Sequence, residues 1–137
     1  MRILAQQLTS TSSGISVTNT TTGDALAQND CRSKTVDGSW TNATGTLYNE
    51  NLAKPGKWLE TFGGPPVNYT VIAIGDDFSV EYDCSTSAFG ITNYCVHIMS
   101  RKRTMDSAQF NSLMKFAEDL GLNPDKLPIQ MTLQEGC

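Results

Sequence analysis

The sequence has little of what a membrane protein needs. Its longest uninterrupted aliphatic run, VIAI at residues 71–74, is far shorter than the roughly 20 apolar residues that a transmembrane helix requires. The opening MRILAQQLTS also lacks the apolar core of about 7–15 residues that a secretory signal carries. We therefore expect neither a transmembrane segment nor a signal peptide in this chain.

Basic charge and histidine are scarce as well. The 137 residues include 14 acidic and 10 basic side chains, for a net charge of -4, and one histidine, His97. The only dense basic run is Arg101, Lys102 and Arg103. A nucleic-acid-binding surface needs many cations on one face, because its affinity comes from neutralising phosphates. We therefore expect no nucleic-acid partner.

The remaining composition is that of a globular protein. Hydrophobic residues make up 39% of the chain, and the 11 glycines bring the apolar share close to the usual range of about 45–50%. A chain of this length buries roughly two-thirds of its unfolded surface in one core. Residues 1–137 are therefore predicted to form a single domain.

Two features favour an extracellular protein. An even number of cysteines is compatible with two disulfides, with three possible pairings, and free thiols in a cytosolic protein are the alternative. The four cysteines are Cys31, Cys84, Cys95 and Cys137. Sequons of the form N-x-[ST] make glycosylation candidates of Asn19, Asn42 and Asn68. About two such sequons would arise by chance in a chain this rich in Asn, Ser and Thr, so they support secretion only weakly.

Alternating apolar and polar residues predict strands with no helix between them. Residues 14–19 alternate, residues 20–30 read as a loop or a weakly formed strand end, and residues 37–50 alternate loosely after a turn at Asp37-Gly38. Further strands are predicted at residues 57–62, 69–74, 78–84 and 93–100, with a hard break at Gly63–Pro66. This order indicates an antiparallel meander.

One helix is predicted after the strands. Its apolar stripe consists of Phe110, Leu113, Met114, Ala117 and Leu120, with Thr104 or Asp106 as the cap and Gly121 as the stop. Packing against the core is favoured over partner binding, because any docked surface helix shows such a stripe. Residues 127–137 are expected to add a short final strand.

The order of these elements resembles the lipocalin family, whose eight-stranded barrel is followed by an outer helix. GISVTN (residues 14–19) looks like the third strand of the family and PGKWLETF (55–62) like the fifth. NYTVIAIGDDFSVEYDC (68–84) matches the sixth and seventh, and YCVHIMSR (94–101) is similar to the closing strand. Apolipoprotein D and the carotenoid-binding crustacyanins are the branches it resembles most. The implied fold class is an all-β, antiparallel up-and-down lipocalin-type barrel, incomplete at about six to seven strands, with one C-terminal helix packed outside.

The chain departs from the family pattern at its start. Lipocalins carry Gly-x-Trp on the first strand, and that tryptophan packs under the arginine that Arg101 resembles. Gly38-Ser39-Trp40 and Gly56-Lys57-Trp58 come too late to serve this role. We therefore expect the first strand and part of the second to be missing, and the Arg101 guanidinium to find another acceptor or water. In apolipoprotein D-like members the cysteines matching Cys84 and Cys137 pair near that missing segment.

The resemblance implies a cup whose inward side chains bind a small apolar molecule. The implied ligand-binding residues are Trp58, Phe62, Tyr69, Val71, Cys95, His97 and Met99. Val96 and Ile98 would face outward, under the helix. For His97, orienting a ligand oxygen and a purely structural role are both open.

An enzyme, a metal site and a cofactor are not expected. Cys95 and His97 lie two residues apart, and some lipocalins use a barrel thiol in isomerisation, but no orienting third group is evident and a disulfide would remove the thiol. The same two residues fall short of the three or four ligands of a zinc site.

Two functions follow from this reading. The first is an extracellular carrier of a lipid, retinoid, steroid, carotenoid or bilin. The second is a secreted interaction or inhibitor module that uses the loops STSAFGIT (residues 85–92) and FGGPPVN (62–68). The sequence does not choose an oligomeric state.

Overall fold

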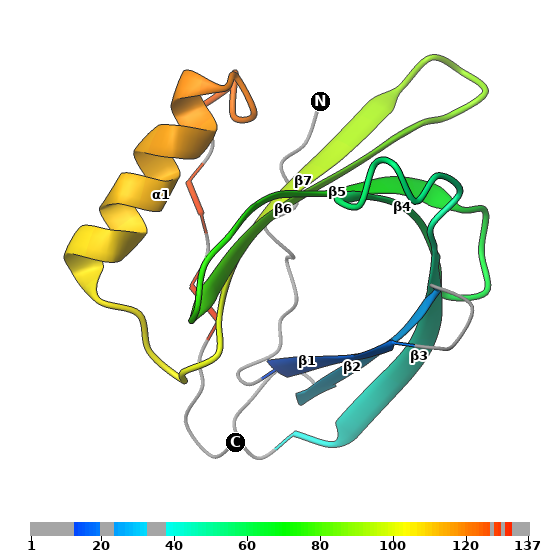
Figure 1. Ribbon diagram of the computed structural model, residues 1–137, viewed down its shortest axis with the longest axis horizontal. Helices are drawn as coiled ribbons and strands as arrows, with labels where there is room; N and C mark the ends of the chain where they lie inside the picture. The colour runs from blue at the N-terminus through cyan, green and yellow to red at the C-terminus, as the bar shows by residue number, and fades with distance from the viewer. Residues whose placement is uncertain (1–12, 20–23, 33–37, 127, 130, 133–137) are drawn as a thin grey trace. The chain divides into compact units, whose positions relative to one another are not determined.

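The computed structural model describes residues 13–19, 24–32, 38–126, 128–129 and 131–132. Within these residues, seven strands are followed by one helix, and the strand order in the sheet is the chain order (Figure 1). The elements are β1 (Ser13–Asn19), β2 (Ala25–Arg32), β3 (Trp40–Tyr48), β4 (Lys57–Thr61), β5 (Val67–Ile74), β6 (Phe78–Thr86), β7 (Thr92–Ser100) and α1 (Ser107–Asp119). The predicted all-β class with a C-terminal helix is confirmed.

The chain divides into two compact units. The β1–β4 unit contains the described residues up to Asn68 together with Met131 and Thr132, and the β5–α1 unit contains those from Tyr69 to Ile129. The single domain expected over residues 1–137 stays a prediction.

Strand β2 of the β1–β4 unit corrects the sequence analysis, which read residues 20–30 as a loop or a weak strand end. Every residue of β2 is paired with β3, and its first seven are also paired with β1, both antiparallel. Its buried positions are the small residues Ala25 and Ala27. Backbone hydrogen bonds to two neighbours hold this polar segment extended although its residues have low strand propensity. Two strands, β2 and β3, therefore separate GISVTN from KWLET, whereas the resemblance of these segments to the third and fifth lipocalin strands leaves room for one.

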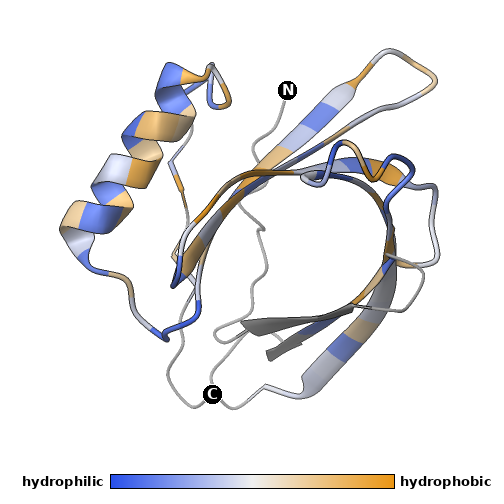
Figure 2. Ribbon diagram, in the orientation of Figure 1, coloured by the Kyte–Doolittle hydropathy of each residue, from blue (hydrophilic) through white to orange (hydrophobic). Residues whose placement is uncertain are grey.

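The core of the β5–α1 unit lies between the helix and the last two strands. Val80 and Val96 pack against Leu113 and Ala117. Ile98 packs against the same cluster, so the prediction that Val96 and Ile98 lie under the helix is confirmed. Figure 2 shows hydrophobic residues concentrated along these strands and recurring along α1. Core packing, the preferred reading of the helical stripe, is confirmed at its centre.

Helix α1 is bounded by residues that the sequence analysis predicted as its cap and its stop. Asp106, one of the two predicted caps, accepts hydrogen bonds from the backbone N–H groups of Ala108 (2.9 Å) and Gln109 (3.2 Å). Gly121 follows the helix with a φ of 71°, a conformation that glycine adopts without strain. Beyond it, the buried Tyr94 donates a hydrogen bond of 3.0 Å to Asp125 and ties this loop to β7.

The last residues were expected to form a short strand. Pro128, Ile129, Met131 and Thr132 carry none, and the other residues of that segment lie outside the described part of the chain. The turn predicted at Asp37-Gly38 also falls partly outside it.

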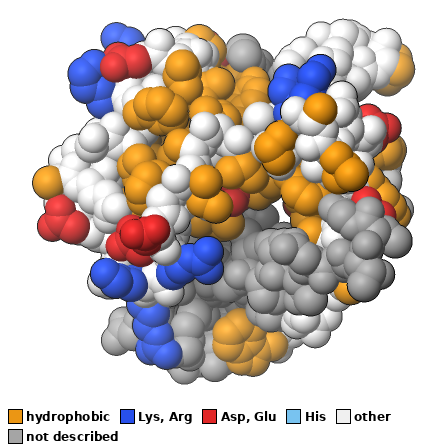
Figure 3. Space-filling view, viewed as in Figure 1, with side chains coloured by type: hydrophobic (Ala, Val, Ile, Leu, Met, Phe, Trp, Pro, Cys, Tyr) orange, Lys and Arg blue, Asp and Glu red, His pale blue; other side chains and the backbone are white. Residues whose placement is uncertain are grey.

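A basic corner follows β7, as the sequence indicated. The Arg101 Nε donates a hydrogen bond of 3.1 Å to the carbonyl oxygen of Asp76, which is the substitute acceptor that the sequence analysis expected. Lys102 lies 3.5 Å from Asp77. Figure 3 shows basic and acidic side chains side by side in this region. None of the described helices has the length and hydropathy of a membrane span.

Candidate functional site

The two faces of the β6–β7 hairpin have different chemistry. Because side chains alternate along a strand, those not under the helix share the opposite face. We name this the polar face; it consists of Ser79, Glu81, Asp83 and Ser85 of β6 and Asn93, Cys95, His97 and Met99 of β7. The antiparallel register brings specific pairs together, since Asp83 lies directly opposite Cys95 and Glu81 directly opposite His97. Polar side chains that are far apart in the sequence therefore lie together on one surface.

Asp83, Cys95 and His97 form a tight cluster on the polar face. One ligand atom from each residue lies within 4.8 Å of the other two. The His97 Nε2 is 3.0 Å from the Asp83 Oδ2, and these side chains are 23% and 20% exposed. Burial alone would lower the pKa of His97, but hydrogen bonds to Asp83 and Cys95 and electrostatic interaction with these two groups raise it from 6.5 to about 10.

Glu81 is the most deeply buried acid beside this cluster, at 5% exposed. A buried carboxylate must be hydrogen-bonded, because otherwise the loss of its hydration costs several kcal/mol. The Tyr69 hydroxyl donates to its Oε2, and the Ser79 hydroxyl donates to its Oε1 at 2.7 Å. Both oxygens are thus held by neutral donors on the same surface.

The structure brings four of the seven predicted ligand-binding residues to one surface. Cys95, His97 and Met99 are half-buried on the polar face, and Tyr69 reaches it through Glu81. Val71 is half-buried in β5, but Ala73, two residues further on, packs against the helix cluster. Tyr69, two residues before Val71, instead contacts Glu81 of the polar face, so alternation along β5 assigns Val71 to neither surface.

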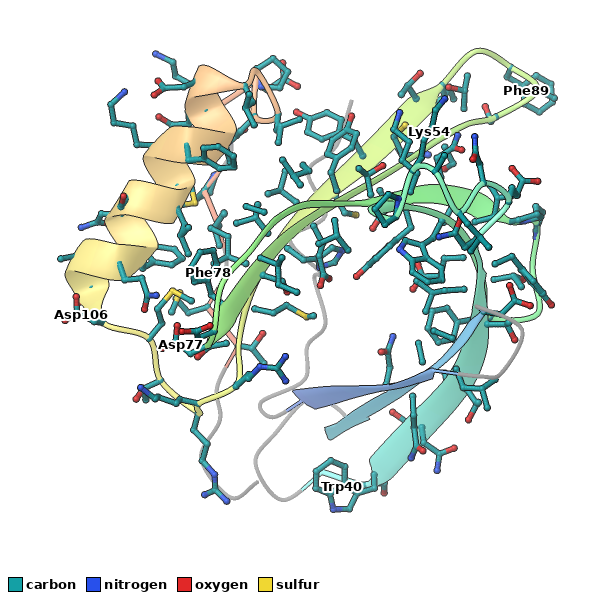
Figure 4. The ribbon with its side chains drawn as sticks, in the orientation of Figure 1. Trp40, Lys54, Asp77, Phe78, Phe89 and Asp106 are labelled. Carbon is teal, nitrogen blue, oxygen red and sulfur yellow. The ribbon has the colours of Figure 1, made fainter. Side chains whose placement is uncertain are left out.

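Trp58 and Phe62 belong to the other unit. Trp58 lies in a pocket of about 200 Å³ together with Leu59, Glu50, Asn51, Lys54, Lys57 and Asn68. Figure 4 shows Lys54 in the segment before β4. Phe62 follows β4 and covers the buried Gly45, where an added Cβ would come within 2.7 Å of its ring. This glycine therefore allows the aromatic ring to lie directly on β3.

The cysteines and sequons occupy different environments. Cys84 and Cys95 are free thiols on neighbouring strands, but the register places them on opposite faces, which excludes a bond between these two. The side chains of Cys31 and Cys137 lie outside the described residues, so the predicted disulfides stay predictions. Asn42 and Asn68 are exposed, and the side chain of Asn19 is not among those described.

Sequence reasoning missed Asp83 and Glu81. It counted Cys95 and His97 as two ligands, too few for a metal, whereas the cross-strand neighbour Asp83 makes three. The available signal was the hairpin itself, because pairing Phe78 with Ser100 fixes every other pair down to Thr86 and Thr92. Without the register of β6 against β7, the sequence does not indicate that Asp83 lies beside Cys95.

Comparison with known proteins gives relatives only at the level of structure. No protein-family model and no curated protein sequence matches the chain. Lobster apocrustacyanin A1 is similar with a TM-score of 0.69 at 13% identity, over 88% of this chain and 66% of that one. Apocrustacyanin C1 has a TM-score of 0.67 at 12% identity, over 87% of this chain and 65% of that one. An odorant-binding protein has a TM-score of 0.56 at 16% identity, over 83% of this chain and 75% of that one.

The chain thus spans slightly less than two thirds of the length of the crustacyanins it matches. At these identities the similarity concerns the arrangement of the elements and not the residues of a site. The strand order, the antiparallel pairing and the helix after the last strand agree with it. The protein therefore has the lipocalin fold.

Proposed function

We propose that this protein binds and transports a small hydrophobic molecule in an extracellular setting. The observation that carries the proposal is the division of β7 between its two faces. Val96 and Ile98 pack under the helix, while Cys95, His97 and Met99 are half-buried on the polar face. Met99 offers apolar surface there, and Cys95 and His97 are polar groups that can orient a ligand, and sites for small molecules combine these two kinds of side chain.

The pocket at Trp58 supports the same proposal and narrows the ligand class. Its indole and Leu59 provide apolar surface, and Lys54 and Lys57 add two cationic groups against the one acid of the pocket, Glu50. Such a combination suits a molecule with an apolar body and an anionic end, such as a fatty acid. The volume of about 200 Å³ is below the roughly 300–1,000 Å³ of sites for drug-sized ligands. It therefore accommodates a small molecule or one end of a longer one.

The structural neighbours add limited support. One of them is an odorant-binding protein by name, and odorants are small and mostly apolar. The choice among lipid, retinoid, steroid, carotenoid and bilin belongs to experiment.

Fluorescence of single-tryptophan variants tests the proposal. Trp40→Phe leaves Trp58 as the only tryptophan, and Trp58→Phe leaves Trp40, which is 51% exposed in β3. Titration with a fatty-acid probe, and then with retinol, should quench Trp58 saturably at about one ligand per chain. The variant that retains Trp40 should show only a weak, linear decrease. Linear quenching in both variants of a folded protein would contradict ligand binding at the pocket.

The interaction module keeps one specific observation in its favour. Phe89, in the loop between β6 and β7, is 92% exposed, and Ile91 is 59% exposed (Figure 4). Exposed aromatic side chains on loops are frequent anchors at protein interfaces. Phe89→Ser separates the two functions, because it should abolish capture of a protein partner and leave the quenching of Trp58 unchanged.

A further inference from the structure

We propose that Asp83, Cys95 and His97 form a binding site for one divalent cation of the zinc class. The site goes beyond the carriage of a hydrophobic molecule and does not depend on it. A thiolate, an imidazole and a carboxylate are the three ligand types that Zn²⁺ takes from proteins. Three protein ligands leave a fourth position open to water or to an added molecule.

The geometry of the cluster fits such an ion. Zinc–ligand bonds of about 2.0–2.3 Å place the ligand atoms of a tetrahedral site roughly 3.3–3.7 Å from one another. Here the three atoms lie within 4.8 Å of one another, and two of them, His97 Nε2 and Asp83 Oδ2, are 3.0 Å apart. Small side-chain rotations therefore close the site. All three ligands come from paired β-strands, which hold their backbones in register.

The same three residue types also make up a cysteine nucleophile with its base and acid, but the arrangement differs. In such a relay the imidazole ring stands between the acid and the nucleophile, which keeps the carboxylate oxygen and the sulfur roughly 7 Å apart. Here the ligand atoms of Asp83 and Cys95 are within 4.8 Å, because these residues lie directly opposite each other. Convergence of all three atoms on one point is the arrangement that a metal ion requires.

The electrostatics of the polar face favour a cation. Among its eight side chains only His97 can carry a positive charge, whereas Glu81 and Asp83 are acids. Glu81 lies opposite His97, and its oxygens are engaged by Tyr69 and Ser79. An acidic side chain in this position, beside the site and not among its ligands, favours a bound cation over a neutral ligand.

Binding of the divalent cation requires no oxidant or reductant. The ion takes the place of the proton shared between His97 and Asp83 and displaces the thiol proton of Cys95, so protons are released to solvent. The carboxylate and the thiolate together neutralise the two positive charges of the ion. A reduced Cys95 is the only chemical requirement, and Cys95 is a free thiol in this structure.

Cobalt substitution tests the site on the full chain. Reduced protein is titrated with Co²⁺, and the sulfur-to-cobalt charge-transfer absorption is recorded, followed by displacement with Zn²⁺. We expect a band that saturates at about one equivalent and disappears on addition of zinc. Cys95→Ser should abolish the band, and Asp83→Asn should weaken cobalt binding at least about 10-fold, since even the loss of an outer-shell partner costs 10–100-fold.

Cys84→Ser is the matched control, because this thiol lies on the opposite face of the same hairpin. It should bind cobalt as the unaltered protein does, with circular dichroism confirming that every variant is folded. Absence of a band in the unaltered protein, or a band that survives Cys95→Ser, would overturn the proposal. No hydrophobic ligand is present in this experiment, so its result and that of the tryptophan titration are independent.

Discussion

The ion pair between Asp83 and His97 makes the stability of the β5–α1 unit depend on pH. In the metal-free protein the pKa of His97 is raised from 6.5 to about 10, so the folded state holds a proton that the unfolded chain releases earlier. This stabilisation is fully present below about pH 6.5 and is lost as the pH rises through about 10. Among the described residues of the β6–β7 hairpin, Asp83, Cys95 and Glu81 are the ionisable groups that share a face with His97.

Urea unfolding with a chelator present measures this effect. At pH 6 the unaltered protein should be more stable than His97→Gln, by on the order of 1–3 kcal/mol, and the difference should shrink toward pH 10. Asp83→Asn should lose most of the same pH dependence, since the carboxylate is one of the two partners that hold the proton. Identical pH profiles for the unaltered protein and His97→Gln would refute the role of the pair.

At this residue scale, the sequence identified the partners only in part. Cys95, His97 and Met99 were correctly assigned to the face opposite Val96 and Ile98, because strand alternation is readable from one segment alone. Asp83 was missed, because a contact between two strands depends on their register, and a one-residue shift would turn it to the other face.

At the scale of elements, Asp106 is responsible for the start of α1. The Asp106 side chain accepts two backbone hydrogen bonds at the start of the helix (Figure 4). Thr104, the other predicted cap, lies two residues before Asp106 in the sequence. Asp106→Ala should lower the free energy of unfolding by about 1 kcal/mol, because it leaves helix N–H groups without an acceptor. Thr104→Ala should change it by less than about 0.5 kcal/mol. Urea unfolding of both variants decides between the caps, and a larger loss at Thr104 would reverse the assignment.

The elements were predictable to the extent that each carried its own pattern. Strands β5, β6 and β7 and the helix have apolar residues at the right period, and their bounds were found within a few residues. Strand β2 lacks such a pattern, because its buried positions are alanines and Asn29 and Asp30 are poor strand formers. Strand β2 is extended because it pairs with β1 and β3, and the residues of β2 alone do not predict this pairing.

At the scale of the whole molecule, the order of the elements was more informative than any motif. Each quoted segment is short and permissive, yet seven strands followed by one helix suffice to match solved lipocalin structures at 12–16% identity. The side chains of the site vary freely at such identities, which is why the fold was predictable and the ligand was not.

The proposed extracellular setting makes a prediction for the whole chain. If the protein is directed through the secretory pathway of a eukaryotic cell, Asn42 and Asn68 should be glycosylated, because both are exposed members of sequons. Gel mobility should increase on treatment with an N-glycosidase. Asn42→Gln with Asn68→Gln should remove the glycosidase-sensitive shift due to these sites. An unmodified protein recovered from the medium would contradict the assignment of these sequons.

The position of Asn68 has a consequence for how binding is studied. Asn68 lines the pocket that also contains Trp58, so a sugar chain attached there would obstruct the pocket in which we propose that a ligand binds. Protein made in bacteria and protein secreted by animal cells would then differ in access rates rather than in fold. The expression host becomes an experimental variable, and Asn68→Gln is the change that equalises the two preparations.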